Sequence, residues 1–294
     1  MRSDPADFEF VAPTSLQDAV KLLAEQQKAW LPIAGGTDVM VQFAAGTLAA
    51  RNLLSIWNVP ELKRIEILPG EVQIGAGCTY TDLREHEVIA IEFPLLVRAA
   101  SLTGSIANQN RGTLGGNIVN ASPAADSLPA LLVYGAELIL VSVRGERRIA
   151  YCDFHTGYKQ MQLAADELVR AICLPRNFSG YVSYTRKVGA RRAQAISKVC
   201  IAALGRVQRA TSVFIEDVRI ALGSVAPVPI RLTGTERILI GNRLDSALVL
   251  RAEKTAAAEI RPISDMRSTV SYRTAVVSNL VGEFLERLGE GDGR

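Results

Sequence analysis

The spacing of apolar residues over the first 60 positions predicts alternating strands and helices. An amphipathic run begins after Ser15, whose hydroxyl with Asp18 three residues later resembles a helix-capping arrangement. Residues 30–33 predict a short strand, residues 39–45 have helical spacing, and residues 53–56 have the apolar pattern of a buried strand. This order favours a small α/β unit at the beginning of the chain.

From residue 64 onward, short alternating runs predict strands that pair as hairpins. The expected strands are 64–67, 71–74, 137–141, 147–150 and 167–172, and the expected helices are 81–85 and 95–101. Pro175-Arg176-Asn177 then interrupts the pattern, so we place a domain boundary there.

Beyond that boundary, apolar strands are followed by helices, which predicts an α+β domain with a three-stranded antiparallel sheet. The expected strands are 181–188, 195–207 and 213–222, and the expected helices are 234–240, 247–259 and 274–288. Residues 289–294 are expected to be frayed.

Composition and charge narrow the classes of function. The chain has 294 residues, of which 48% are apolar and 21% charged, a composition typical of a globular protein with more than one domain. The net charge of +3 is too small to indicate nucleic-acid binding. Residues 176–215 carry no acidic residue, and we interpret them as a basic surface or a subunit contact. The basic residues of this segment are Arg176, Arg186, Lys187, Arg191, Arg192, Lys198, Arg206 and Arg209.

The cysteines and histidines predict no metal site and no catalytic group. The four cysteines lie far apart in sequence, and the two histidines, His86 and His155, occur in different contexts, so we assign them core or surface roles. The sequence shows no signal peptide and no long uncharged span, which predicts a cytoplasmic protein without a membrane span.

Two double-glycine segments carry the candidate chemistry. They are Ala34-Gly35-Gly36-Thr37-Asp38 and Thr113-Leu114-Gly115-Gly116-Asn117. Glycine lets the backbone approach a ligand and adopt a positive φ, so successive amides can converge on an anion. Either segment alone is weak evidence, but two of them suggest a site for the two phosphates of a dinucleotide.

Asp126 and Lys187 each allow two interpretations. Asp126 either caps a helix over residues 127–134 or accepts hydrogen bonds from a ribose hydroxyl or a flavin ring N–H. Lys187 is either solvated or balances negative charge at the edge of a cofactor.

The two glycine segments, with Gly112 preceding the second, resemble the FAD-pyrophosphate loops of a known family. This family comprises the FAD-binding medium subunits of molybdenum hydroxylases of the xanthine dehydrogenase and carbon monoxide dehydrogenase type. The similarity includes residues 120–127, 154–159 and 187–192. It implies a two-subdomain FAD-binding domain of the PCMH type over residues 1–175, with subdomains of about 1–60 and 61–175. An α+β medium-subunit domain would follow over 176–294.

The resemblance also implies which residues contact FAD. The diphosphate and ribityl chain would contact Pro32, Ile33, Ala34, Gly35, Gly36, Thr37, Asp38, Val39, Thr113, Leu114, Gly115, Gly116 and Asn117. Gly104 and Ser105 would lie against the isoalloxazine, Asp126 would bond the cofactor, and Val169 and Lys187 would complete the flavin side.

The partners implied are a large molybdopterin-binding subunit and a small subunit with two [2Fe-2S] clusters, with electrons passing through FAD to an acceptor such as NAD. One departure is that Ala107 and Gln109 stand where the family commonly has Gln and Arg. Two alternatives remain open: a self-sufficient FAD-dependent oxidase or dehydrogenase of the same fold superfamily, and a non-catalytic interaction module that has lost its cofactor.

Overall fold

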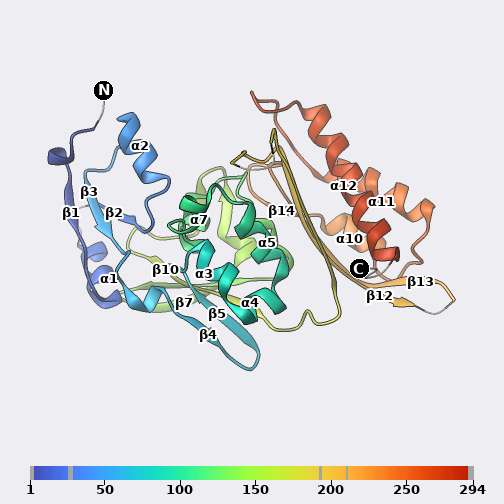
Figure 1. Cartoon of the computed structure of the whole chain (residues 1–294), viewed down its shortest axis with the longest axis horizontal. Coiled ribbons are helices and arrows are strands. Elements are labelled where there is room, and N and C mark those ends of the chain that lie inside the picture. The colour runs from blue at the N-terminus through green and yellow to red at the C-terminus, as the bar shows by residue number, and fades with distance from the viewer. Residues whose placement is uncertain (1–2, 26–28, 192–193, 210, 291–294) are drawn as a thin grey trace. The chain divides into compact units, whose positions relative to one another are not determined.

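The chain forms two compact units in the computed structural model, which describes residues 3–25, 29–191, 194–209 and 211–290 (Figure 1). Unit 1 comprises Met1–His86, Gly104–Ala121 and Gly135–Arg176. Unit 2 comprises Glu87–Thr103, Ser122–Tyr134 and Asn177–Arg294. Two expectations lie outside the described residues: Arg192 in the basic segment, and the frayed end at 291–294.

Unit 1 begins with a small parallel sheet of order β1-β3-β2. Its strands are β1 (Glu9–Val11), β2 (Trp30–Ile33) and β3 (Asn52–Ser55). The last two were predicted; β1 was not, because three residues are too short to show alternation. The helices α1 (Leu16–Ala24) and α2 (Val39–Ala45) connect the strands. The predicted cap is confirmed, since the Ser15 hydroxyl accepts a hydrogen bond from the Asp18 amide.

A second, five-stranded sheet of unit 1 has the order β4-β5-β10-β6-β7, and all its neighbouring strands are antiparallel. The strands are β4 (Ile65–Ile67), β5 (Glu71–Gly75), β6 (Glu137–Ser142), β7 (Gly145–Ala150) and β10 (Leu168–Pro175). Both predicted hairpins are present. Buried Leu54 of β3 packs in one cluster with Val141 of β6 and Leu168 of β10, so the two sheets share a hydrophobic core.

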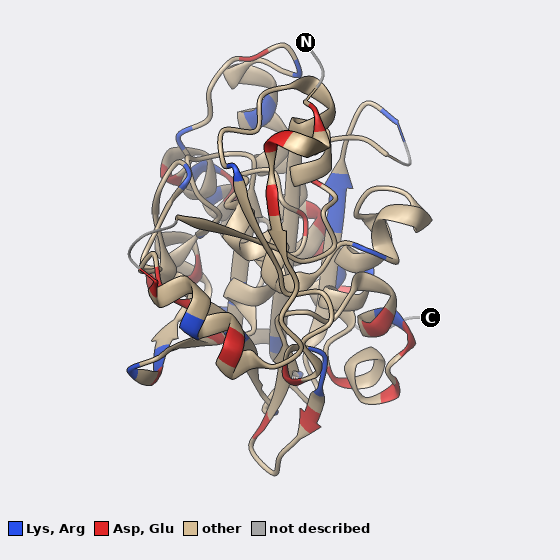
Figure 2. Cartoon of the chain, turned by 90° about the vertical axis from the view of Figure 1, so that its left-hand side faces the viewer, with Lys and Arg blue, Asp and Glu red and all other residues tan. Residues whose placement is uncertain are grey.

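The remaining elements of unit 1 are short. They are η1 (Pro5–Asp7), η2 (Pro60–Leu62), α3 (Tyr80–Glu85), α6 (Ile106–Gln109), α7 (Leu114–Asn120), α9 (Tyr151–Phe154), β8 (His155–Gly157) and β9 (Gln160–Met161). Red and blue segments are both scattered over the ribbon in Figure 2, as expected for a chain with nearly balanced acidic and basic residues.

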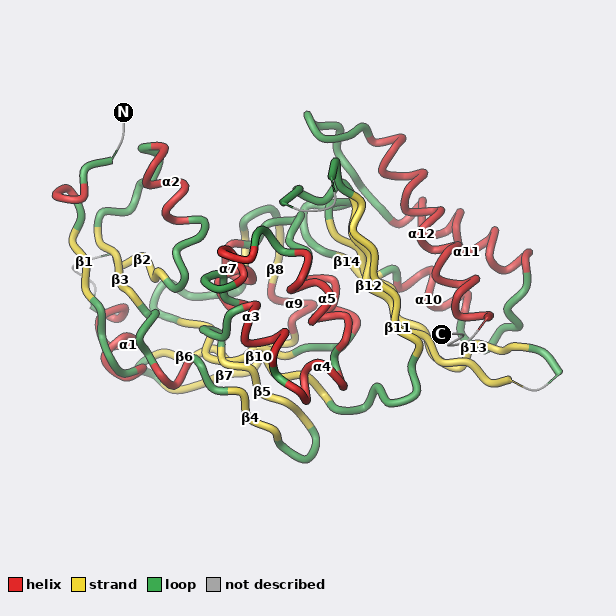
Figure 3. The backbone as a smooth tube through the Cα atoms, viewed as in Figure 1, coloured by secondary structure: helices red, strands yellow, loops and turns green. Residues whose placement is uncertain are grey.

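Unit 2 is built on an antiparallel sheet of order β11-β12-β13-β14. Its strands are β11 (Val182–Val188), β12 (Val199–Arg209), β13 (Val213–Gly223) and β14 (Ile230–Arg231). The three predicted strands are present, and the two-residue β14 joins them as a fourth. The long β12 and β13 form the continuous ribbon seen in Figure 3.

Helices cover this sheet on both sides. They are α4 (Glu87–Glu92), α5 (Pro94–Leu102), α8 (Leu128–Val133), α10 (Thr233–Leu239), α11 (Ser246–Glu259) and α12 (Val270–Glu290). Figure 1 shows α10, α11 and α12 together on one side of the sheet and α5 on the other. Buried Val277, Val281 and Phe284 repeat every three to four residues and give α12 its apolar face. The α12 helix extends through Glu290, so residues 289 and 290 are helical, where fraying was expected.

Candidate functional site

The first glycine segment, defined as residues 34–38, connects the end of β2 to the start of α2. Gly36 has φ +74°, a conformation that favours glycine. Within the part of the chain that the structure describes, the amides of Gly35, Gly36, Thr37 and Asp38 donate to no protein acceptor. The segment therefore offers four consecutive unpaired donors, the arrangement expected of an anion-binding loop.

The second glycine segment, defined as residues 112–117, has the opposite hydrogen-bonding state. Two of its three glycines, Gly115 and Gly116, lie inside α7, and Thr113 is the N-cap of that helix. The Leu114 amide donates to the Cys78 carbonyl at 3.0 Å, and the Gly115 amide donates to the Ala76 carbonyl at 2.9 Å. The Gly116 amide donates to the Thr113 hydroxyl at 3.0 Å. The expectation that both segments present unpaired amides is therefore wrong for this one, because its donors complete the start of a helix.

The structure brings the two segments together within unit 1. A Cβ on Gly35 would lie 1.6 Å from the Arg111 carbonyl oxygen, a distance that no side chain tolerates. A Cβ on Gly115 would lie 2.5 Å from the Ala76 side chain, whereas exposed Gly116 would meet only the Thr113 hydroxyl, at 2.8 Å. Gly35 and Gly115 thus serve close backbone packing, and Gly116 leaves open surface beside it.

Gly104, Ser105 and Val169 occupy separate places in unit 1. Gly104 has φ +58°, and a Cβ there would lie 2.8 Å from the Asn108 side chain. Ser105 is the N-cap of α6, and its hydroxyl accepts a hydrogen bond from the Asn108 amide. Val169 is buried in β10, where the pairing with β6 shifts register between Val169 and Ala171.

Asp126 and Lys187 form a buried ion pair in unit 2. Their side chains are each only 9% exposed, and the Lys187 Nζ lies 2.6 Å from the Asp126 carboxylate. The same ammonium donates to the Leu102 carbonyl at 2.9 Å, and the Ser197 hydroxyl donates to the other carboxylate oxygen. Burial raises the pKa of Asp126, and Lys187 and Ser197 counteract that rise.

This geometry excludes the simpler interpretation of each of the two residues. The N-cap of α8 is Ser127, without a side-chain cap bond, so the interpretation of Asp126 as a helix cap is wrong. Lys187 is not solvated either, because its side chain is only 9% exposed and donates to the Leu102 carbonyl and the Asp126 carboxylate. Asp126 is held as a carboxylate acceptor with both oxygens already engaged by the protein.

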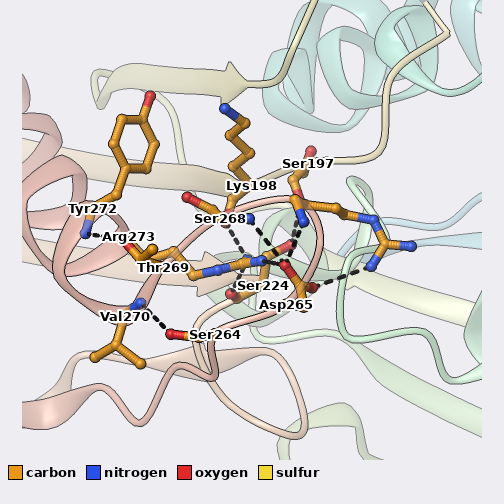
Figure 4. A network of polar contacts seen from close by, with 11 residues as sticks. Ser197, Lys198, Ser224, Ser264, Asp265, Ser268, Thr269, Val270, Tyr272 and Arg273 are labelled. Atoms are coloured by element: carbon orange, nitrogen blue, oxygen red, sulfur yellow. Dashed lines mark hydrogen bonds and ion pairs between the residues drawn. The ribbon is translucent and has the colours of Figure 1, made fainter.

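A further network fixes the segment that carries Ser197 (Figure 4). The Arg273 guanidinium is buried and donates to the Lys198 and Ser224 carbonyls and to the Asp265 carboxylate. The Ser224 hydroxyl donates to the Ser197 carbonyl at 3.0 Å. A continuous series of hydrogen bonds therefore runs from Asp265 to Asp126 through these residues.

The electrostatics of this network favour the ionised carboxylate of Asp265. Burial works to raise the pKa of Asp265, but the amides of Arg267 and Ser268 and the Arg273 guanidinium outweigh it and lower the pKa to about 2. Sequence reasoning missed Ser197, Arg273 and Asp265, because single polar residues outside a periodic pattern carry no signal of their long-range partners.

The two residues that depart from the family pattern, Ala107 and Gln109, both lie in α6. Gln109 is buried, and its side-chain oxygen accepts a hydrogen bond from the Arg84 guanidinium at 2.7 Å. Ala107 is exposed in α6. The uncommon glutamine therefore has a structural partner within unit 1.

Both ring nitrogens of His155 lie close to other groups of unit 1. One of its ring nitrogens lies 2.8 Å from the Ile118 carbonyl at the end of α7, and the other lies 3.3 Å from the Tyr151 hydroxyl. Burial lowers the pKa of His155.

Over the described ranges, no group of three or more His, Cys, Asp or Glu side chains is arranged to hold a metal ion. None of the described helices is long and apolar enough to cross a membrane.

Comparison with known proteins matches both parts of the chain to protein families. Residues 6–177 match the FAD-binding domain in molybdopterin dehydrogenase, and residues 184–288 match the CO dehydrogenase flavoprotein C-terminal domain. The glyceraldehyde dehydrogenase medium chain of Sulfolobus acidocaldarius is 32% identical over 277 residues, which are 94% of this chain and 96% of that protein. The xanthine dehydrogenase FAD-binding subunit of Escherichia coli O157:H7 is 31% identical and covers 95% and 96% of the two chains.

A solved structure agrees with these matches. A chain of carbon monoxide dehydrogenase from Hydrogenophaga pseudoflava superimposes with a TM-score of 0.89 at 28% identity, covering 95% of this chain and 96% of that one. The fold, the family matches and the relatives show that this chain belongs to the FAD-binding medium subunits of the xanthine dehydrogenase and carbon monoxide dehydrogenase family.

Proposed function

We propose that this chain is the electron-transfer subunit of a multi-subunit molybdenum hydroxylase, which takes electrons from [2Fe-2S] clusters of a partner subunit and passes them through FAD to an acceptor such as NAD. The observation that carries the proposal is the first glycine segment, with four unpaired amides in a domain of the FAD-binding family. FAD supplies the redox chemistry, because its isoalloxazine exchanges single electrons as well as hydride.

The residues of the first glycine segment fit a diphosphate. Hydrogen bonds to a charged acceptor contribute about 1.5–3 kcal/mol each, so several main-chain amides suffice to hold it without a P-loop lysine. We propose that residues 32–39 hold the diphosphate and that the second glycine segment contacts the cofactor through the open surface beside Gly116 and through side chains. Thr113 and Asn117 are the candidates for those side-chain contacts.

The remaining cofactor contacts are part of the same proposal. Gly104 and Ser105 are assigned to the isoalloxazine, and Asp126, Val169 and Lys187 to the flavin side of the cofactor. Because Lys187 and Ser197 already engage both Asp126 oxygens, a further hydrogen bond to this carboxylate would use the second lone pair of an oxygen. The pair would thus present a fixed, ionised acceptor rather than a mobile proton carrier.

We also propose the assembly and the domain division. The names of the relatives, medium chain and FAD-binding subunit, support an assembly with further subunits. In this proposal a large subunit carries molybdopterin, a small subunit carries the [2Fe-2S] clusters, and the complex is cytoplasmic. The proposed division is an FAD-binding domain over 1–175 and a medium-subunit domain over 176–294. Helices α5 and α8 precede residue 176 but contact the strands of unit 2, so the first domain expressed alone would leave them without their packing partners.

The test is flavin content and electron transfer. We expect the purified chain, or its complex, to carry one FAD per chain and to show the visible flavin spectrum. Replacing Gly35 and Gly116 together with valine should abolish that spectrum, and a double variant that keeps stoichiometric FAD would refute the site. Turnover of a small organic donor by the isolated chain would instead support a self-sufficient oxidase or dehydrogenase.

A further inference from the structure

Two cations lie over one aromatic ring in unit 1. The Arg111 guanidinium carbon is 3.8 Å from the centroid of the Trp57 ring, and the Lys63 Nζ is 4.1 Å from the same centroid. Trp57 is half-buried, whereas Lys63 and Arg111 are exposed. The electron-rich face of the ring attracts both cations and favours these side-chain positions.

Neither cation has a carboxylate partner among the residues that the structure describes. By contrast, Arg147 and Arg148 of the same unit pair with Glu167 and Glu71. Two like charges beside one ring repel each other, and the nearby ring does not neutralise them. An anion bound beside them would offset that repulsion, so the arrangement favours a negatively charged ligand.

The cations lie at the same edge of the parallel sheet as the first glycine segment. The Ile56 amide donates to the Ile33 carbonyl, so Trp57 and residue 34 both follow the carboxyl ends of adjacent strands. The backbone carbonyl of Arg111 packs directly against Gly35. Ligands of open α/β sheets bind at the carboxyl ends of strands, which places the two cations and the four unpaired amides at one binding edge.

We propose that Lys63 and Arg111, held by Trp57, form a cationic subsite for the diphosphate of FAD bound at the first glycine segment. This inference rests on the proposed function and deepens it. The subsite supplies two positive charges, whereas the first glycine segment carries one carboxylate, that of Asp38. Arg111 would act from its side chain on the phosphate while its backbone fixes the distance between the two glycine segments.

The experiment measures FAD binding to the full-length chain after its cofactor has been removed, by quenching of flavin fluorescence at low and high salt. The variants are Lys63→Gln and Arg111→Gln. Arg64→Gln is the matched control, because Arg64 is an exposed neighbour in sequence for which the described residues show no cation–π contact with the ring. We expect Arg111→Gln to weaken FAD binding on the order of tenfold to a hundredfold at low salt, with a smaller loss for Lys63→Gln and none for the control.

A second arm separates electrostatics from packing. Trp57→Phe keeps an aromatic ring, and we expect it to retain most of the FAD affinity, whereas Trp57→Leu should lose affinity because the cations are no longer held. The loss in Arg111→Gln should shrink at high salt, because salt screens an exposed charge. A loss that is equal at both salt concentrations would show a packing role and overturn the proposal.

A third arm identifies the ligand. If Lys63→Gln and Arg111→Gln bind FAD like the wild type but bind NADH more weakly, the subsite belongs to the acceptor and the proposal is overturned. Unchanged affinity for both nucleotides also overturns it. Failure of the wild-type chain to bind FAD at all would overturn the proposed function itself, a result distinct from any effect of these variants.

Discussion

The two glycine segments look alike in sequence and differ in what they offer a ligand. Residues 34–38 leave four consecutive amides without a protein acceptor, while the amides of residues 114–116 are all bonded within unit 1. The first segment follows a strand end, where the chain turns with Gly36 at positive φ. The second begins a helix that is packed against residues 76–78. A double glycine therefore marks close backbone approach in both places but an amide site in only one.

The ion pair of unit 2 resembles the second segment in this respect. Asp126 and Lys187 are buried and engaged by the protein, so their polar atoms are committed before any ligand arrives. The first glycine segment thus has amides that no protein group engages, whereas the polar atoms of the second segment and of the ion pair are already bonded within the protein. Groups that are already bonded stabilise the fold, so changing them should first alter stability.

The largest effect is expected from Gly35→Val. Its Cβ would meet the Arg111 carbonyl, a backbone atom that cannot move away without separating the two glycine segments. We expect a loss of about 4 kcal/mol or more in the free energy of unfolding, with loss of FAD. Thermal unfolding and flavin absorbance measure both.

The matched control is Gly70→Val, because a Cβ at Gly70 meets nothing within 4 Å and its φ is not positive. This variant should unfold and bind FAD like the wild type. Should Gly35→Val retain wild-type stability, the contact between the two segments would be wrong, and with it the comparison.

The next largest effect is expected from Lys187→Met, which leaves the Asp126 carboxylate buried without its partner. Removing one member of a buried pair costs about 3–5 kcal/mol. The double variant Lys187→Met/Asp126→Asn should recover a large part of that loss, because no uncompensated charge remains. Urea unfolding of the flavin-free chain measures the difference.

The same variant has a predicted pH dependence. Burial raises the pKa of Asp126 above its ordinary value of 3.8, so the folded state binds this proton more tightly than the unfolded state does. Stability from this group is therefore greatest below pH 3.8 and declines as pH rises through the folded pKa. Without Lys187 the pKa of Asp126 rises further, so the loss relative to wild type should grow as the pH rises above 3.8. A loss that does not vary with pH would contradict this account.

A smaller effect should separate the glycines of the second segment. Gly115→Ala places a Cβ 2.5 Å from the Ala76 side chain, and overpacking of this kind costs about 1–3 kcal/mol. At Gly116 an added Cβ meets only the Thr113 hydroxyl, at 2.8 Å, so this hydroxyl must shift slightly, but alanine is the better helix former in α7. We therefore expect Gly116→Ala to lose less stability than Gly115→Ala.

The FAD affinity of Gly116→Ala tests whether the cofactor approaches α7 at this position. If stability is preserved and FAD binding falls, a ligand approaches the helix at Gly116. Equal destabilisation by both substitutions would contradict the assignment of Gly115 to packing and Gly116 to open surface.

The sequence predicted most of the elements because their patterns are local. Alternation gave the hairpins β4–β5 and β6–β7, and three-to-four spacing gave α11 and α12. It missed β1, which is three residues long, and the shift of the start of β12 from residue 195 to Val199. Short elements and boundaries depend on tertiary pairing, which spacing along one segment does not contain.

The candidate site was predictable only as far as residue types go. The resemblance indicated Asp126 and Lys187, but their pairing spans 61 positions and depends on β11 lying beside α5, which in turn contacts α8. The difference between the glycine segments was not predictable either. Whether an amide is free depends on distant carbonyls such as those of Ala76 and Cys78.

The smallest predicted effect tests whether the Thr113 hydroxyl holds the Gly116 amide of the second glycine segment. Thr113 caps α7, and its hydroxyl accepts the Gly116 amide. Thr113→Val removes that acceptor and should cost about 0.5–2 kcal/mol in the flavin-free chain, whereas Thr113→Ser keeps the acceptor and should cost much less. If Thr113→Val unfolds like the wild type in urea, the cap does not hold the Gly116 amide. That amide would then be a donor available to a ligand, and the second segment would resemble the first more closely than its hydrogen bonds indicate.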